Sequence, residues 1–198
     1  MALNELDALL AQVRDCRICA AHLPFPPRPV LRAAGSARVQ IVGQAPGRRV
    51  HETGIPWNDP SGDLLRKWLG IDRAAFYDAK RIAIIPAGFC YPGKGPSGDL
   101  PPRPECAPQW QPRLRALLPR LRLTLLVGQY AQAYYLGARK RKTLADTVRD
   151  YGEYLPEFFP LPHPSPRNRR WLAQNAWFER DVLPVLRGRF RAALGAML

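Results

Sequence analysis

The chain has 198 residues and a formal net charge of +14, because 30 Lys and Arg oppose 16 Asp and Glu. Its length fits a single domain over residues 1–198, and its hydrophobic content of 46% argues against a disordered chain. The charge surplus predicts binding to a polyanion, and five Trp and seven Tyr can supply rings that stack on bases. These totals favour a nucleic-acid-binding protein over one whose basic surface has no specific partner.

No apolar run approaches the roughly 20 residues that a membrane span needs, so we expect no membrane contact. The N-terminal stretch MALNELDALL lacks the positive region and apolar stretch of a secretory signal. We therefore expect a cytoplasmic protein, and we expect it to be a monomer. In that reducing compartment, four cysteines are more typical of metal or cluster ligands than of disulfides.

The first predicted element is a helix over residues 4–20, capped by Asn4. Its apolar side chains recur at the helical spacings of three and four: Leu6, Leu9, Leu10 and Val13. A proline-rich loop follows over 23–30, and RVQIVG at 38–43 predicts a short buried strand.

A long loop is expected over 44–60, followed by a helix that Ser61 could cap and that ends at Leu69. Residues 81–87 predict a second strand, and Gly and Pro then predict a loop as far as Pro108. The remaining chain predicts, in order, a helix over 109–118, a strand over 121–127, a helix over 131–136, a basic stretch at 138–142 with a helical segment after it, a strand over 158–161 and a long helix over 168–187. The basic stretch, ARKRK, could contact DNA or form a solvated turn.

Strands that alternate with helices predict a parallel α/β sandwich. In such a sheet, the ligand site lies beyond the carboxyl ends of the strands. Four loops should meet at that edge, namely those after Val42, Ala87, Val127 and Leu161.

The cysteines form two pairs. Cys16 and Cys19 make a C-x2-C motif at the end of the first predicted helix, whereas Cys90 and Cys106 lie in the Gly/Pro-rich loop. Four thiolates can ligate a [4Fe–4S] cluster or a zinc ion, and His22 keeps a mixed zinc site open. The alternative is four unconnected small side chains in the core.

Two strand-end loops carry the other candidate residues. The first is a tight GQAPG turn whose backbone N–H groups can point into a cleft: Gly43, Gln44, Ala45, Pro46 and Gly47. It could bind a phosphate or a carbonyl, or simply form a turn. Trp57, farther along this loop, could stack on a planar ligand or pack in the core.

The second loop, HPSPRN, follows the last predicted strand. Two prolines hold His163 and Ser165 rigidly, and Arg167, Asn168 and Arg169 then open a helix whose N-terminus favours anions. A histidine in this setting favours a functional role over a structural one.

These motifs together resemble the uracil-DNA glycosylase superfamily. The resemblance spans nearly the whole chain in order: CRIC, GQAPG, ETGIPW, Cys90, Cys106, LLVGQYA and HPSPRN. The chain is most similar to the iron–sulfur uracil-DNA glycosylases, whereas HPSPRN resembles the loop of the single-strand-selective monofunctional enzymes. The resemblance implies a three-layer αβα sandwich with a central parallel four-stranded sheet. It also favours a [4Fe–4S] cluster on Cys16, Cys19, Cys90 and Cys106 over zinc.

The resemblance also implies residue roles. The backbone of Gln44 and Ala45 would hold a pyrimidine carbonyl, Trp57 would stack on the base, and His163 would donate a hydrogen bond to O2 of the departing base. Ser165, Arg167 and Asn168 would enter the minor groove and press on phosphates, with Arg169 beside them.

Three positions depart from the family pattern. Gln44 replaces a glutamate and cannot act as a general base, and Ala45 offers no carboxylate. The asparagine that reads the uracil edge would fall near Pro86, which has no donor. His51 and Glu52 are candidates for positioning the water, although both could be solvated loop residues.

We therefore predict a monofunctional DNA glycosylase that removes a deaminated base, with uracil first, by base flipping. The alternatives are a glycosylase for hypoxanthine or xanthine, a damaged-DNA-binding protein of the same fold without catalysis, and an RNA-directed or zinc-bound binding module. The preferred base, the strandedness of the DNA and the residue that holds the water are left open by the sequence.

Overall fold

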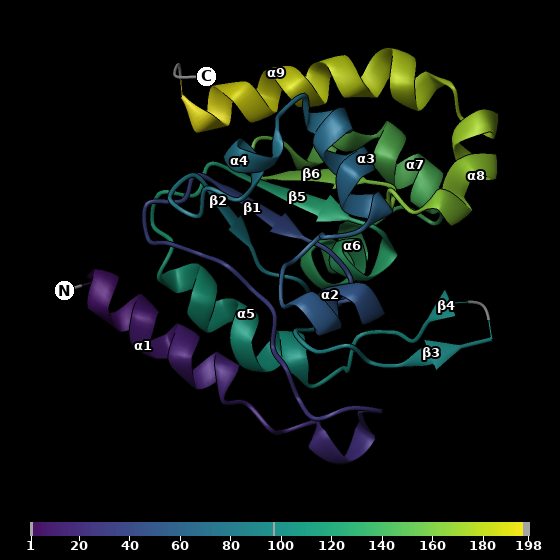
Figure 1. Cartoon of the computed structure of the whole chain (residues 1–198). Helices are drawn as coiled ribbons and strands as arrows, with labels where there is room; N and C mark the ends of the chain where they lie inside the picture. The colour runs from purple at the N-terminus through teal and green to yellow at the C-terminus, as the bar shows by residue number, and fades with distance from the viewer. Residues whose placement is uncertain (1, 97, 196–198) are drawn as a thin grey trace.

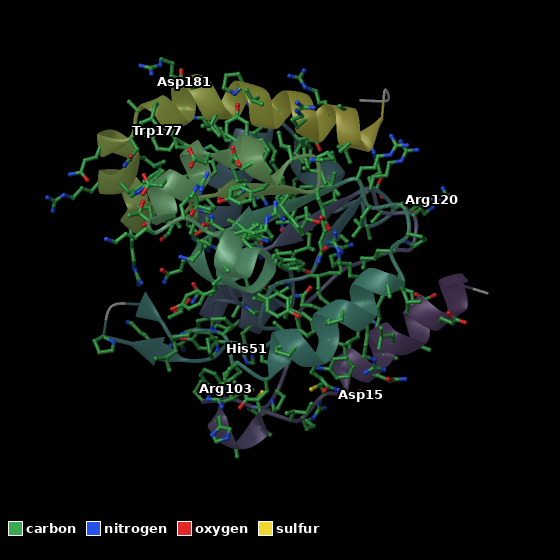
Figure 2. The ribbon with its side chains drawn as sticks, turned by 180° about the vertical axis from the view of Figure 1, so that it is seen from behind. Asp15, His51, Arg103, Arg120, Trp177 and Asp181 are labelled. Atoms are coloured by element: carbon green, nitrogen blue, oxygen red, sulfur yellow. The ribbon has the colours of Figure 1, made fainter. Side chains whose placement is uncertain are left out.

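A computed structural model describes residues 2–96 and 98–195 of the chain. Its centre is a four-stranded sheet in the order β2-β1-β5-β6, in which every neighbouring pair is parallel. The strands are β1 (Val39–Val42), β2 (Ile82–Ile84), β5 (Leu123–Val127) and β6 (Phe158–Leu161). Helices cover both faces of this sheet (Figure 1, and Figure 2 from behind), so the expected three-layer αβα sandwich is confirmed.

The strands are short and almost wholly apolar because both faces of the sheet are buried. On one face Leu125 and Val127 join the core beneath α9 (Leu183–Leu194) and α3 (Pro60–Leu69). On the other face, Leu126 packs with α6 (Gln129–Leu136). Successive side chains of a strand point to opposite faces of the sheet and therefore pack in two separate cores.

A third core lies between α1 (Ala2–Arg14) and α5 (Cys106–Ala116), below the edge of the sheet that β2 forms. Leu6 and Leu114 are buried in it together with Phe89. The shorter elements are α2 (Arg48–Thr53), α4 (Arg73–Phe76), α7 (Leu144–Arg149), α8 (Arg169–Gln174), the 3-10 turns Ala20–His22, Gly137–Arg139, Tyr151–Tyr154 and Pro166–Asn168, and the π turn Phe178–Val182. Among the described residues, no helix is both long and apolar enough to cross a membrane.

The predicted bounds of the first helix were wrong at both ends. The helix begins at Ala2, so Asn4 lies inside it and is not its cap, and it ends at Arg14 instead of residue 20. Val13 is the last apolar residue on the face that packs against α5, and burial therefore no longer favours helix beyond it. Cys16 and Cys19 consequently lie in the turns after the helix.

The predicted loop over 44–60 contains a helix, α2, and Gly54 after its last residue caps it in the left-handed conformation with φ 69°. The cap of α3 is Asp59, not Ser61, because the Asp59 Oδ1 atom accepts a hydrogen bond from Gly62 N at 2.8 Å. Pro60 occupies the first turn, where its missing N–H costs nothing and its fixed φ favours the helix.

The predicted terminal helix over 168–187 is broken. It divides into α8, a π turn and α9, and the break lies at Asn175, whose ψ is 51°. The Asn175 Nδ2 atom donates to Trp171 O at 2.8 Å, and its Oδ1 atom accepts from Trp177 Nε1 at 3.0 Å. These side-chain bonds compete with the helical ladder and turn the chain.

The Gly/Pro-rich loop forms a small antiparallel hairpin from β3 (Lys94–Gly95) and β4 (Gly98–Asp99), which the sequence did not predict. Figure 1 shows it projecting from the body of the protein on the side of α2.

Candidate active site

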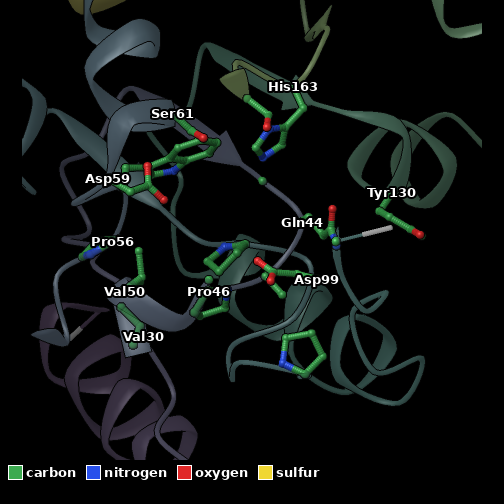
Figure 3. Close-up of a pocket in the computed structure, with 18 of the residues that line it drawn as sticks. Val30, Gln44, Pro46, Val50, Pro56, Asp59, Ser61, Asp99, Tyr130 and His163 are labelled. Atoms are coloured by element: carbon green, nitrogen blue, oxygen red, sulfur yellow. The ribbon is translucent and has the colours of Figure 1, made fainter. Parts of the chain in front are cut away.

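A cavity of about 620 Å³ opens at the carboxyl edge of the sheet. It is lined by the GQAPG loop, the segment between α2 and α3, the β3–β4 hairpin, the start of α6 and the HPSPRN loop (Figure 3). The folding pattern explains this meeting, because parallel strands bring the loops at their carboxyl ends to one edge.

Backbone hydrogen bonds hold the GQAPG loop against the segment that follows β2. Ala87 N donates to Gly43 O at 2.9 Å, and Gly88 N donates to Gln44 O at 2.8 Å, which continues the β1–β2 pairing past the end of the strands. The Gln44 side chain reaches the hairpin, where its Nε2 atom donates to Leu100 O at 3.0 Å. Gln44 therefore supports the wall of the cavity as well as lining it.

Trp57 forms one side of the cavity in a strained backbone conformation, with φ 57° for a residue other than glycine. A Cβ atom on Gly43 would stand 2.7 Å from Trp57 Cζ2, and a side chain on Gly62 would collide with the Trp57 carbonyl. Two glycines thus make room for one indole. Strain of this kind is typical of functional sites.

His163 stands against this indole, and the two ring centroids lie 5.6 Å apart. Burial lowers the pKa of His163, and the charge of Asp59 opposes that shift only in part. The imidazole is therefore neutral near pH 7 and keeps one N–H as a donor. Its loop is fixed by Asn168, whose Nδ2 atom donates to His163 O at 2.7 Å.

The other residues of the HPSPRN loop differ in position. Ser165, Arg167 and Asn168 line the cavity, and the Ser165 Oγ atom accepts a hydrogen bond from Arg167 N at 3.2 Å. Arg169 begins α8, is exposed and does not line the cavity. The exposed Arg167 reaches across to the hairpin, since a side chain on Gly98 would collide with its guanidinium.

The structure does not bring His51 and Glu52 to the cavity. The His51 ring stacks on Phe25 at a centroid distance of 5.3 Å, and Glu52 forms an ion pair with Arg48 at 2.9 Å. Neither side chain lines the cavity, which α2 reaches through Val50 instead. Helical spacing explains the difference, because Val50 and its neighbour His51 lie on different faces of α2.

Pro86 lines the cavity, and the family resemblance implies that the base-reading position falls near it. Its carbonyl oxygen is already occupied, because it accepts a hydrogen bond from Gln111 Nε2 at 2.7 Å. This part of the wall therefore offers neither a side-chain donor nor a backbone N–H.

Two carboxylates in the cavity wall escaped the sequence analysis. Asp59 caps α3, and the sequence signal D-P-S-G could have revealed it as a cap beside Trp57. Asp99 belongs to β4, where a hairpin of two-residue strands leaves no signal in the sequence.

The four cysteines line one small, separate cavity of about 20 Å³: Cys16, Cys19, Cys90 and Cys106. All four are free thiols, and burial raises the pKa of Cys90 to about 11 and that of Cys106 to about 12. Four soft donors around one cavity suit a thiophilic metal or cluster, whose positive charge would favour the thiolates. In residues 2–96 and 98–195, however, no three His, Cys, Asp or Glu side chains are arranged as ligands of one metal ion.

The chain is similar to known proteins of one superfamily. The family model of the uracil DNA glycosylase superfamily matches residues 31–187. Among solved structures, the chain is similar to a solution NMR structure of a Methanosarcina acetivorans protein named as a candidate uracil DNA glycosylase, with 19% sequence identity and a TM-score of 0.48. That similarity covers 82% of this chain and 99% of the other. Because the family model spans most of its length, the chain belongs to the uracil-DNA glycosylase superfamily.

Proposed function

We propose that this protein is a monofunctional DNA glycosylase that hydrolyses the N-glycosidic bond of a flipped, deaminated base, with uracil as the first candidate. The observation that carries the proposal is the pairing of Trp57 and His163 across one wall of a cavity that also holds the GQAPG loop. Membership of the superfamily supports the same conclusion.

Binding begins with charge. The net charge of +14 attracts DNA, and Arg167 stands at the rim of the cavity, where phosphates of a flipped nucleotide would pass. Extruding the base costs a few kcal/mol of stacking and pairing, which contacts in the cavity must offset. A cavity of about 620 Å³ is large enough for a base and part of its sugar.

Bond cleavage places negative charge on the departing base and positive charge on the sugar. The neutral His163 imidazole can donate a hydrogen bond to O2 of the base, and the backbone of Gln44 and Ala45 can hold a second carbonyl. Each preorganised donor of this kind contributes about 10²–10³-fold to the rate. Trp57 offers the ring face on which the base would stack.

A single displacement by water fits the lining of the cavity. Among the described residues that line it, there is no lysine that could form a Schiff base with the sugar. This supports a monofunctional enzyme that leaves an abasic site without cutting the strand.

We further propose that Cys16, Cys19, Cys90 and Cys106 hold a [4Fe–4S] cluster, with zinc as the alternative. A cluster there would supply structure, because it would tie the turns after α1 to α5 and to the loop after β2. The cysteines line a cavity of their own, and glycosidic hydrolysis transfers no electron.

A second candidate is a glycosylase for hypoxanthine or xanthine. The specific observation in its favour is that Pro86 lines the cavity without a side-chain donor or a backbone N–H to read the edge of uracil. The same observation also allows a damaged-DNA-binding protein without catalysis. The test is to incubate the purified protein with oligonucleotides that carry uracil, hypoxanthine or xanthine and then to cleave abasic sites chemically. Product from none of the three would refute the glycosylase.

A further inference from the structure

The hydrolysis proposed above needs a water molecule that is held and deprotonated as it attacks the sugar. Such a group must face the cavity, accept a hydrogen bond and have no permanent partner. Two described carboxylates line the cavity, Asp59 and Asp99, and Figure 3 shows both turned toward the space between them.

Asp59 is committed to the fold. Its Oδ1 atom accepts the hydrogen bond from Gly62 N at 2.8 Å that caps α3. Full proton transfer to this carboxylate would weaken a cap, and a cap contributes about 1 kcal/mol to helix stability.

Asp99 has no such commitment. Among the described residues, none donates a hydrogen bond to its side chain, and the residue is exposed toward the cavity. Its Oδ2 atom lies 3.3 Å from the point where a Cβ atom on Gly47 would stand, so the carboxylate rests directly against the GQAPG loop.

The hairpin holds this carboxylate in place. Asp99 pairs with Lys94 across the two strands, and Leu100 N donates to Gly93 O at 2.8 Å. The bond from Gln44 Nε2 to Leu100 O ties the hairpin to the GQAPG loop. A carboxylate is thereby brought to a loop that contains none of its own.

The surroundings of Asp99 raise the pKa of its carboxyl group. Loss of hydration is the main cause that raises its pKa, and the negative charge of Asp59 adds to the rise. Arg167 and Lys94 act in the opposite direction, and the charge of Asp99 in turn raises the pKa of Tyr91. A raised pKa makes a carboxylate a better proton acceptor.

We infer that Asp99, delivered by the β3–β4 hairpin, positions and deprotonates the water that attacks C1′ of the flipped nucleotide. The C1′–N bond breaks with its electron pair on the base, the water oxygen bonds to C1′, and a proton of that water passes to Asp99. Asp99 then releases this proton to solvent and the base anion takes one up, so that water and the nucleotide become an abasic sugar and the free base. This role rests on the proposed glycosylase activity.

The experiment is a single-turnover rate measurement on a uracil oligonucleotide over a pH series, for wild type and Asp99→Asn. We expect Asp99→Asn to lose about 10²-fold in rate, the low end of general-base effects, because a dissociative path needs modest help. The wild-type rate should fall at acid pH as Asp99 becomes protonated, whereas the rate of Asp99→Asn should not show this fall. DNA affinity and melting temperature should not change. The matched control is Glu179→Gln, an exposed acid on the π turn, which should behave as wild type.

Rescue separates chemistry from structure. Formate should restore part of the rate of Asp99→Ala, because the small carboxylate can occupy the vacated space, and it should not accelerate wild type. If Asp59→Asn, and not Asp99→Asn, removes the acid limb, Asp59 is the base and the inference is wrong. Retained rate in Asp99→Asn, or no rescue by formate, also overturns it. Inactive wild type on every substrate would instead refute the proposed glycosylase itself.

Discussion

The indole of Trp57 lies against the imidazole of His163, with ring centroids 5.6 Å apart and planes inclined by 29°. The two residues are far apart in the chain, since Trp57 lies between α2 and α3 and His163 follows β6. Each is supported by a glycine, since Gly43 backs the indole and Gly128, with φ 86°, backs the imidazole. Both rings are thus fixed before any base enters, which is the preorganisation that stabilises a developing charge.

We expect Gly43→Ala to disturb this pair. The new Cβ atom would stand 2.7 Å from Trp57 Cζ2, and the indole cannot retreat without moving His163. Overpacking of this kind costs about 1–3 kcal/mol of unfolding free energy, and the glycosylase rate should fall as well. Urea unfolding and single-turnover assays measure the two effects.

The matched control for that substitution is Gly188→Ala in α9, where nothing lies within 4 Å of the added Cβ atom. Alanine favours a helix over glycine by about 1 kcal/mol, so this variant should be as stable as wild type or more stable. A Gly43→Ala protein with unchanged stability and rate would contradict the tight packing at Trp57.

His163→Ala should lose about 10²–10³-fold in single-turnover rate while retaining most of its affinity for DNA, because it removes a donor to the transition state. His51→Ala serves as the control, since the structure places His51 against Phe25 and outside the cavity. Full activity in His163→Ala, or an equal loss in His51→Ala, would reverse the assignment of the two histidines.

Stability should fall as the pH drops below about 6.5. Burial lowers the pKa of His163 in the folded protein below its ordinary value of 6.5, so the unfolded chain takes up a proton first. The stabilisation is complete above pH 6.5 and is lost as the pH falls through the lowered pKa. His51 has a pKa shift in the same direction, for which burial and Arg28 are the causes.

This pH effect is measured by melting temperatures between pH 7.5 and 5, a range of roughly one unit or more on either side of an ordinary histidine pKa. His163→Gln should flatten the decline, and the double variant with His51→Gln should flatten it further. An unchanged slope in both would show that carboxylates, not these histidines, control acid sensitivity.

Binding to DNA should weaken steeply with salt, as the net charge of +14 requires. Arg167→Ala should reduce the slope of log affinity against log salt by about 0.7–0.9, the value of one phosphate contact. The control is Arg180→Ala, because Arg180 already pairs with Asp181 at 2.7 Å. Fluorescence anisotropy with a labelled oligonucleotide measures both slopes, and equal slopes for the two variants would exclude a phosphate contact by Arg167.

Protein purified without oxygen should be brown and absorb near ~400 nm if the cysteines hold a [4Fe–4S] cluster. Cys90→Ser or Cys106→Ser should lose iron and colour and should melt at a lower temperature, because both thiols are partly buried and line one cavity with the other two cysteines. A colourless protein that contains zinc would overturn the iron–sulfur choice and keep the metal site. Protein that contains neither iron nor zinc would show that the four cysteines are core thiols and hold no metal.

The sequence by itself determined the layers and the main loops of the site. Apolar runs such as VQIV at 39–42 need burial on both faces, and only a parallel sheet between helices supplies it. Since strand ends must then meet, the approach of Gln44 to His163 follows from topology alone. The four cysteines likewise come to one place because the pairing of α1 with α5 brings their neighbouring segments together.

The tertiary structure alone decided which side chains face the cavity. His51 looked suited to hold a water, but one step along α2 turns it toward Phe25 and leaves Val50 at the cavity. Asp99 had no local signal, because a hairpin of two-residue strands is stabilised by contacts such as the bond from Gln44 to Leu100 and not by its own pattern. Periodicity records which residues are buried, whereas the direction of a polar side chain in a loop depends on partners that are distant in the chain.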